Sequence, residues 1–287
     1  FFHDGSRRDR GPSAASVAEV GTLSLEFDTL ARFSGEAKYS RAMDGIRTVL
    51  EDERTARIER GHLSLLPLTV YPKPRSPRGG AANGAGRRRK RPAVFRSETI
   101  GLGARGDSYF EYLAKEAVLE PTKLRNTSGA AFARALDEIS SHMLMPISSG
   151  RTFVAELQCR STPTGGQVCD RSTKMDHLAC FLPATIALAI HHGIVTRGLG
   201  HEERAEAILD MCLSMYSSST RGLAPEITWL DQATNETLIS PRDHFNLLRP
   251  ETVESLMVVW RVTGESRWRD AGWAMWRAWE RHARLPK

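Results

Sequence analysis

Two carboxylates that could act on a substrate lie in residues 248–256 of the chain. Pro250 suits the first position of a helix, because its φ angle is already near the helical value and its missing N–H would have no partner there. Glu251 and Glu254 are three residues apart, so they would share one face of the first turn, where the helix dipole favours ionised carboxylates. A general base must be ionised, although the spacing alone favours a purely structural role for these acids.

A second candidate carboxylate follows a glycine-rich segment, residues 101–113. Three glycines permit a tight turn, and Ser108 with Glu111 predicts a capping box that starts a helix. Asp107 would then lie just outside that helix and point past its N-terminus, with Arg105 beside it. The simpler interpretation is that Asp107 is a second capping group.

Two further segments, residues 174–183 and residues 222–227, carry reactive side chains without a clear pattern. His177 and Cys180 are three residues apart, yet no second Cys/His pair has the spacing of zinc ligands, so the sequence predicts no zinc site. Glu226 follows a proline and precedes an extended segment. Neither segment indicates a function by itself.

These four segments need rigid elements to position them, and the sequence predicts helices for that task. Apolar residues recur at steps of three and four in residues 20–30, 39–49, 132–143, 205–215 and 266–284. Alternation with a period of two is brief, as at residues 227–230. We therefore predict an all-α domain whose loops carry the chemistry. Tryptophans at helical spacing in the last stretch favour a packing surface over a sugar platform.

The net charge of +6 comes from one segment, residues 71–97, which holds nine Lys and Arg residues and no acid. Without it the chain carries a net charge of −3. Four prolines and four glycines there exclude a regular helix or strand, so we expect a solvated, disordered insertion. A patch for nucleic acid or an acidic membrane is the alternative, but no interleaved aromatic residues or nucleic-acid motif support it.

The length of 287 residues, with 40% hydrophobic residues, allows one large domain or two ordinary ones. No transmembrane span is predicted, because the best candidate, residues 179–190, is too short and contains Pro183. No signal peptide is visible after Phe1. This opening leads us to expect a chain cut from a longer polypeptide.

Read in order, the four segments resemble glycoside hydrolase family 47, the class I α-1,2-mannosidases that trim high-mannose N-glycans. The resemblance rests on residues 102–109 (Leu-Gly-Ala-Arg-Gly-Asp-Ser-Tyr) and residues 248–255 (Leu-Arg-Pro-Glu-Thr-Val-Glu-Ser). Residues 18–27 also resemble the Ala-Glu-Val…Leu-Glu-Phe helix of the family. Residues 174–183 and 222–227 look more like the endoplasmic-reticulum processing enzymes than like Golgi members.

The resemblance implies an (α/α)7 barrel with the sugar site in its mouth, and an inverting hydrolase that needs Ca²⁺. Carried over position by position, Glu251 matches the base that activates water, and Asp107 and Glu226 match the acid-side carboxylates. The positions that match residues lining the sugar subsites are Arg105, His177, Arg249 and Glu254. Three acids and two arginines at helix ends suit a polar sugar pocket.

The chain departs from the family pattern at both ends. A further catalytic Glu of the family would precede residue 18, and the Thr that binds calcium directly would follow the tryptophan-rich helix. We therefore expect one partial catalytic domain over residues 1–287, an unclosed barrel, no direct metal ligand in this chain, and no hydrolysis by the chain alone.

The cysteines agree with a secretory-pathway address. Cys180 and Cys212 occupy the positions of the structural disulfide of the family, as the resemblance implies. Cys159 and Cys169 could form a second, local bridge, but spacing alone leaves that pairing open. Free core thiols are the alternative for all four. The expected location is the lumen of the endoplasmic reticulum or Golgi.

The expected partners are high-mannose N-glycans on glycoproteins. We expect a monomer that binds no nucleic acid and reaches a membrane only through an anchor outside this chain. One alternative is a catalytically inactive, glycan-binding member of the same fold that acts in glycoprotein degradation. Another is an interaction protein whose basic loop docks on acidic partners. Intact Asp107, Glu226 and Glu251 favour the enzyme over a pure lectin.

Overall fold

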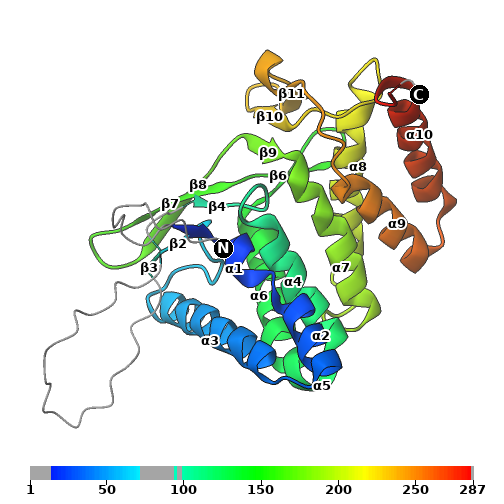
Figure 1. Ribbon diagram of the computed structural model, residues 1–287. Coiled ribbons are helices and arrows are strands. Elements are labelled where there is room, and N and C mark those ends of the chain that lie inside the picture. The colour runs from blue at the N-terminus through cyan, green and yellow to red at the C-terminus, as the bar shows by residue number, and fades with distance from the viewer. Residues whose placement is uncertain (1–13, 72–93, 96–98, 286–287) are drawn as a thin grey trace, which may run out of the picture.

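A computed structural model of the chain describes residues 14–71, 94–95 and 99–285 (Figure 1). The α-helices are α1 (Val17–Gly21), α2 (Ser24–Ser34), α3 (Lys38–Glu59), α4 (Asp107–Leu119), α5 (Pro121–Leu124), α6 (Ala130–His142), α7 (Leu182–His191), α8 (His201–Ser217), α9 (Glu251–Thr263) and α10 (Ser266–His282). Three short turns of 3-10 or π type are η1 (Arg125–Gly129), η2 (His177–Phe181) and η3 (Pro241–Asp243). Most of the basic segment, residues 71–97, lies outside the described residues.

Helices that follow one another along the chain pack side by side. α2 packs on α3, α7 on α8, and α9 on α10, and α7 also packs along both α4 and α9. In Figure 1 the colours accordingly run across the molecule from α3 on one side to α10 on the other. All five predicted helical stretches are confirmed.

The first predicted stretch divides into α1 and α2 at Thr22 and Leu23. The hydroxyl of Thr22 donates to the carbonyl of Ala18 at 2.6 Å, and the backbone of Thr22 leaves the helical region, with φ −122° and ψ 38°. A threonine that bonds back to the preceding turn in this way competes with helix continuation.

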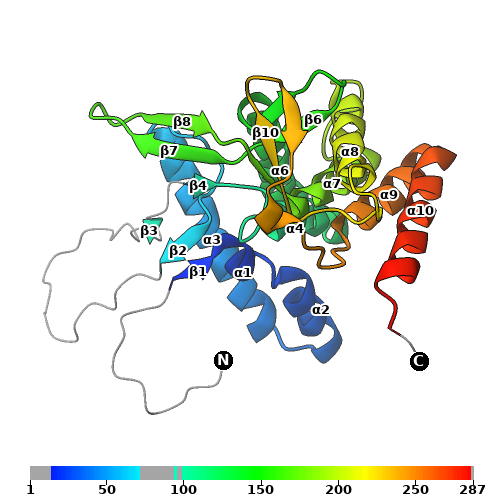
Figure 2. The same ribbon diagram turned by 90° about the horizontal axis from the view of Figure 1, so that it is seen from above.

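The strands form four small sheets between the helices. Their bounds are β1 (Ala15–Ser16), β2 (Thr69–Tyr71), β3 (Val94–Phe95), β4 (Thr99–Ile100), β5 (Leu144–Pro146), β6 (Thr152–Val154), β7 (Leu157–Ser161), β8 (Gln167–Arg171), β9 (Lys174–Asp176), β10 (Ile227–Asp231) and β11 (Glu236–Leu238). The predicted alternation at residues 227–230 is confirmed as β10. The hairpin of β7 and β8 was not predicted, and it projects to one side of the helices (Figure 2).

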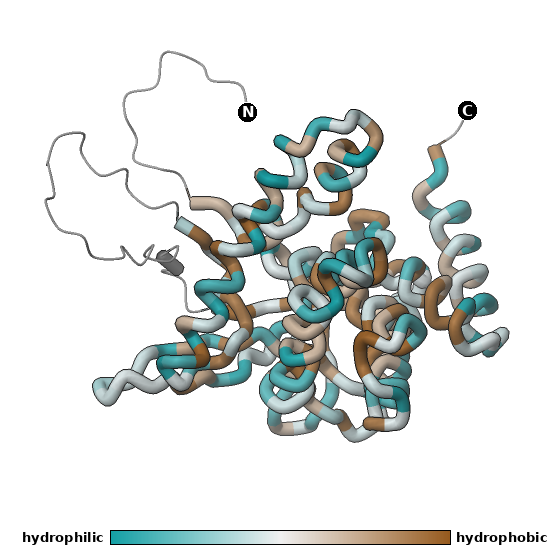
Figure 3. Tube along the Cα trace, turned by 90° about the horizontal axis from the view of Figure 1, so that it is seen from below, coloured by the Kyte–Doolittle hydropathy of each residue, from teal (hydrophilic) through white to brown (hydrophobic). Residues whose placement is uncertain are grey.

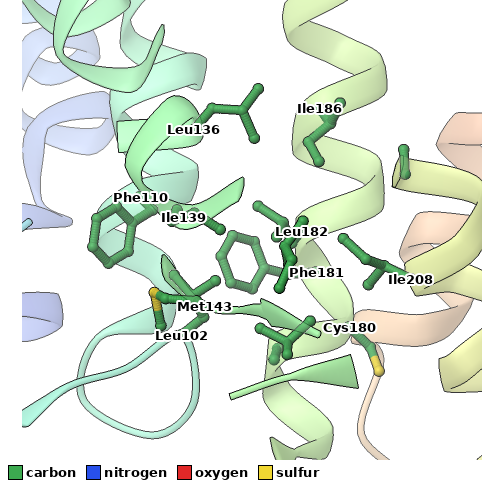
Figure 4. Close-up of a cluster of buried hydrophobic side chains, with 14 of the residues drawn as sticks. Leu102, Phe110, Leu136, Ile139, Met143, Cys180, Phe181, Leu182, Ile186 and Ile208 are labelled. Atoms are coloured by element: carbon green, nitrogen blue, oxygen red, sulfur yellow. The ribbon is translucent and has the colours of Figure 1, made fainter. Parts of the chain in front are cut away.

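The core lies between α4, α6, α7 and α8. Phe110, Phe132, Leu136 and Ile139 are almost fully buried, and Figure 4 shows Ile139 beside Phe181 within this cluster. Each such side chain contributes roughly 1.5–3 kcal/mol on burial. Hydrophobic and hydrophilic residues interleave along the helices (Figure 3), as expected for amphipathic elements with one buried face.

Helix α10 is only in part the packing surface that the sequence predicted. Trp268 is 1% exposed and Trp279 is half-buried, whereas Trp273 and Trp276 are 59% and 48% exposed. None of the described helices is both long enough and apolar enough to cross a bilayer.

Both candidate disulfides are present. Cys180–Cys212 joins η2 to α8, with 6.0 Å between the Cα atoms, so it confirms the pairing that the resemblance implied. Cys159–Cys169 joins β7 to β8 at directly opposed positions, which settles the pairing that spacing alone left open.

Removal of the Cys180–Cys212 disulfide should destabilise the fold more than removal of the other one. Its cysteines are 32 residues apart, against 10 for Cys159–Cys169, and the chain-entropy treatment assigns the longer loop about 3–4 kcal/mol. The free energy of unfolding in urea, measured for the Cys180→Ala/Cys212→Ala double variant, should fall by that amount. The Cys159→Ala/Cys169→Ala variant should lose about 1 kcal/mol less. The reverse order would contradict this assignment.

Candidate functional site

The segment before α9 delivers two acids to the first helical turn. The prediction that Glu251 and Glu254 share this turn is confirmed. The predicted position of Pro250 is wrong by one residue, since the helix begins at Glu251 and the Pro250 carbonyl accepts the N–H of Glu254 at 2.8 Å. A proline can precede the helix in this way because only its carbonyl is needed there.

The start of α4 differs from the predicted capping box. The helix begins at Asp107 itself, no side chain caps it, and Glu111 pairs with Lys115 one turn later. The carbonyl of Gly103 accepts the N–H groups of both Gly106 and Asp107, at 3.1 and 3.0 Å. Asp107 therefore lies in the first helical turn and not outside it, because this backbone turn replaces the predicted side-chain cap.

The carboxylate of Asp176 holds the turn of residues 103–107 that leads into α4. Its Oδ2 accepts the N–H of Ala104 at 3.1 Å, and its Oδ1 lies 2.8 Å from Nζ of Lys174. A Cβ atom on Gly103 would lie only 2.1 Å from Oδ2 of Asp176, so this close approach requires glycine. Asp176 thus fixes the turn that carries Asp107.

The strands β9 and β10 bring His177 and Glu226 together. Asp176 pairs with Ile227 in an antiparallel ladder, and just beyond it the N–H of His177 donates to the carbonyl of Glu226 at 2.9 Å. The predicted extended segment after Glu226 is therefore confirmed, and it places this carboxylate beside the start of η2.

Arg249 lies among the three candidate carboxylates. Its Nε donates to Oε1 of Glu226 at 2.6 Å. This hydrogen bond is the main cause that raises the pKa of Arg249, and the charges of Glu226, Glu251 and Asp107 raise it further against the opposing effect of burial. Arg249 therefore pairs directly with Glu226 and lies within electrostatic range of Asp107 and Glu251.

Burial raises the pKa of Asp107, and the nearby charge of Glu251 raises it further. Hydrogen bonds from Ser108 and the charge of Arg249 act in the opposite direction but do not cancel the shift. A carboxyl group that keeps its proton to a higher pH is suited to act as a general acid.

Glu254 pairs with a lysine that the sequence analysis missed. Nζ of Lys115 lies 3.3 Å from Oε1 of Glu254 and also pairs with Glu111. These carboxylates raise the pKa of Lys115 although burial lowers it. The spacing of four residues between Glu111 and Lys115 was the signal that could have found it.

Arg105 is the predicted site residue that stands apart. It is exposed, has a left-handed φ of 79°, and its carbonyl accepts the N–H of Ala18 at 3.1 Å. Its charge helps, as the smallest of several causes, to lower the pKa of Glu19. Within the described part of the chain, no hydrogen bond or ion pair links its side chain to the other predicted site residues.

Comparison with known proteins gives one consistent result. A family model described as Glycosyl hydrolase family 47 matches residues 2–287. Mannosyl-oligosaccharide 1,2-alpha-mannosidase MNS3 of Arabidopsis thaliana is 31% identical over 99% of this chain and 46% of its own length. The endoplasmic reticulum mannosyl-oligosaccharide 1,2-alpha-mannosidases of Rattus norvegicus and Schizosaccharomyces pombe are each 32% identical, over 96% and 98% of this chain and 37% and 51% of their own lengths.

A solved structure, the alpha-1,2-mannosidase from Trichoderma reesei, shares the fold. Its TM-score is 0.71 at 21% sequence identity, over 95% of this chain and 53% of that chain. This similarity confirms the predicted helical class, the α/α barrel. The chain spans about half the length of the relatives it matches, or less.

A side chain at residue 103 should disturb the turn that carries Asp107. In Gly103→Ala the new methyl group collides with the Asp176 carboxylate, and overpacking of this kind typically costs about 1–3 kcal/mol. The free energy of unfolding in urea measures the loss. Gly45→Ala is the matched control, since Gly45 lies inside α3 with nothing within 4 Å of the added Cβ, and it should stabilise the fold slightly. Equal effects of the two substitutions would refute the close-packing argument.

Proposed function

The chain belongs to glycosyl hydrolase family 47, and from this premise we propose that its site removes terminal α-1,2-linked mannose from high-mannose N-glycans. The observation that carries the proposal is the gathering of Asp107, Glu226 and Glu251 around Arg249. The relatives named as mannosyl-oligosaccharide 1,2-alpha-mannosidases support the substrate class.

Inverting hydrolysis needs a base and an acid on opposite faces of the sugar, with room for a water molecule. Glu251, at the N-terminus of α9, is the proposed base, and it takes a proton from the water as its oxygen attacks the anomeric carbon. Asp107 is the proposed donor of a proton to the departing glycosidic oxygen, which its raised pKa supports. Glu226, oriented by its ion pair with Arg249, is the second proposed carboxylate on the side of the sugar where the leaving oxygen is protonated.

The other predicted site residues would bind the sugar. The planar fork of Arg249 can bond a carboxylate and bridge sugar hydroxyls at the same time. His177 faces Glu251, and Glu254 shares the first turn of α9 with Glu251. Arg105, exposed on the turn before α4, would reach the sugar from the rim.

A calcium requirement is part of the proposal, carried over from the family. Among the described residues, no three His, Cys, Asp or Glu side chains come together as a metal site. No step above passes through a metal. We place the direct protein ligand of Ca²⁺ outside this chain.

The proposed setting is the secretory pathway, in the endoplasmic reticulum or Golgi lumen, with glycoprotein glycans as partners. Two disulfides support an oxidising compartment. The endoplasmic-reticulum relatives support the same pathway. The protein would act as a monomer, and an anchor outside this chain would supply any membrane attachment.

Loss of the proposed base should stop turnover without loss of binding. In the natural protein that carries this chain, Glu251→Gln keeps the shape of the side chain but cannot take a proton from water. We expect turnover of a high-mannose oligosaccharide to fall about 10²–10⁴-fold or more, with its dissociation constant changed less than about threefold. Glu203→Gln, at an exposed position in the first turn of α8, is the matched control and should remain fully active.

Near-normal turnover by Glu251→Gln would refute the assignment of the base. Binding of the glycan without hydrolysis by the unaltered natural protein would identify it instead as the inactive, glycan-binding alternative.

Metal removal tests the calcium proposal separately. The natural protein should lose activity in EDTA and regain it with Ca²⁺ but not with Zn²⁺, because a hard cation with oxygen ligands is expected. The measurement is hydrolysis of the oligosaccharide, monitored through the amount of free mannose released. Recovery with Zn²⁺ would overturn the calcium proposal.

A further inference from the structure

The side chain of His177 is only 2% exposed, and both of its ring nitrogens face polar atoms inside the protein. Nε2 lies 2.8 Å from the hydroxyl of Tyr216 on α8 and 3.1 Å from the hydroxyl of Thr252 on α9. On the other side of the ring, Nδ1 lies 3.8 Å from Oε2 of Glu251. Nδ1 and Oε2 are both buried, and neither has a hydrogen-bond partner in the described part of the chain.

The two hydroxyl groups decide where the proton of His177 lies. The hydroxyl groups of Tyr216 and Thr252 both lie within hydrogen-bond distance of Nε2. Burial raises the pKa of Tyr216 above its ordinary value and the charge of Glu251 raises it further, against the opposing effect of Thr252, which is smaller than that of burial. Tyr216 therefore keeps its single proton near neutral pH. That proton is available to Nε2 of His177, 2.8 Å from the hydroxyl oxygen.

A neutral imidazole has one proton, and a ring nitrogen that accepts a hydrogen bond does not carry it. With Nε2 accepting from Tyr216, the proton of His177 lies on Nδ1, which faces Glu251. In the opposite tautomer a lone pair on Nδ1 would face a carboxylate oxygen, and the two acceptors would repel each other.

We propose that the hydroxyl of Tyr216, supported by that of Thr252, donates to Nε2 of His177, and that this hydrogen-bond series presents the Nδ1–H of His177 to the carboxylate of Glu251. Tyr216 and Thr252 are thus positioning residues, and they act on the reaction through His177. The inference rests on the proposed function only for the role of Glu251 as the base. A separation of 3.8 Å is longer than a hydrogen bond, and catalytic contacts of this kind commonly shorten when substrate binds.

The three elements that contribute to this series are fixed to one another. The disulfide Cys180–Cys212 joins η2, which begins at His177, to α8, one turn before Tyr216. Ser255, fully buried on α9, donates to the carbonyl of Cys180 at 2.5 Å and accepts the N–H of Ala184 at 3.1 Å. The His177 and Tyr216 rings pack edge to face, 5.5 Å apart.

Other charged groups also act on Glu251. Asp107 faces it from α4 and Arg249 from the segment before α9, while Tyr216 on α8 is close enough to feel its charge. A substitution of Tyr216 leaves Asp107 and Arg249 in place. A change in the pH dependence of such a variant therefore reports on the hydrogen-bond series.

The tautomer of His177 is the first test, and it does not depend on activity. The natural protein, labelled with ¹⁵N-histidine, should give an NMR signal for His177 with the proton on Nδ1 at neutral pH. His177→Gln assigns this signal by removing it. In Tyr216→Phe, a substantial population should shift to the Nε2–H tautomer. A His177 protonated on Nε2, or on both nitrogens, in the unaltered protein would overturn the inference.

Kinetics on the glycan is the second test. Tyr216→Phe keeps the ring but removes the donor, so kcat should fall about tenfold with KM within about threefold, and the acidic limb of the pH profile should move to higher pH. Thr252→Val should also lower kcat and shift the acidic limb of the pH profile to higher pH. Thr252→Ser, which keeps the hydroxyl, should have most of the kcat that Thr252→Val loses. Tyr109→Phe is the matched control, because Tyr109 is equally buried and is bonded to Arg54 instead.

A wild-type pH profile in Tyr216→Phe would overturn the inference even if glycan hydrolysis is confirmed. If the natural protein hydrolyses no glycan, the proposed function fails, and the NMR measurement still decides the hydrogen-bond series. The NMR result on the unaltered protein also decides it if a variant fails to fold.

Discussion

Neighbouring ionised carboxylates repel one another, and the guanidinium of Arg249 offsets this repulsion among Asp107, Glu226 and Glu251. It bonds Glu226 directly and feels the charges of Asp107 and Glu251. At a few ångströms, such interactions are worth far more in a partly buried site than in water. The N-termini of α4 and α9 add positive ends of helix dipoles beside two of these acids. The close approach of these acids therefore depends on the charge of Arg249 and on the N-termini of α4 and α9.

The scaffold places these groups by fixing backbone turns. Asp176 holds the turn before α4, the pairing of β9 with β10 sets His177 beside Glu226, and the disulfide of η2 keeps His177 against α8. Each acid thus comes from a different junction in the chain: Asp107 from the start of α4, Glu226 from the residue before β10, and Glu251 from the start of α9. The helices behind these junctions pack into a common core.

The sequence predicted the helices well because their apolar residues recur with helical spacing, and α3, α6, α8 and α10 follow that pattern. It missed the β7–β8 hairpin, whose short strands present mostly polar residues, and it misplaced the start of α4, where a backbone turn replaces a side-chain cap. The family motifs allowed site residues to be proposed from the sequence, and these assignments stay predictions. The supporting residues Asp176 and Tyr216 could not be predicted, because they act through contacts between segments distant in the sequence.

A crystal structure of the natural protein with the Glu251→Gln substitution, soaked with an α-1,2-linked mannose oligosaccharide, tests the central claim most directly. The account predicts that the terminal mannose lies between residue 251 and Asp107, with Arg249 bonded to both Glu226 and a sugar hydroxyl. A sugar bound elsewhere, or Arg249 turned away from the carboxylates with the mannose in place, would contradict it.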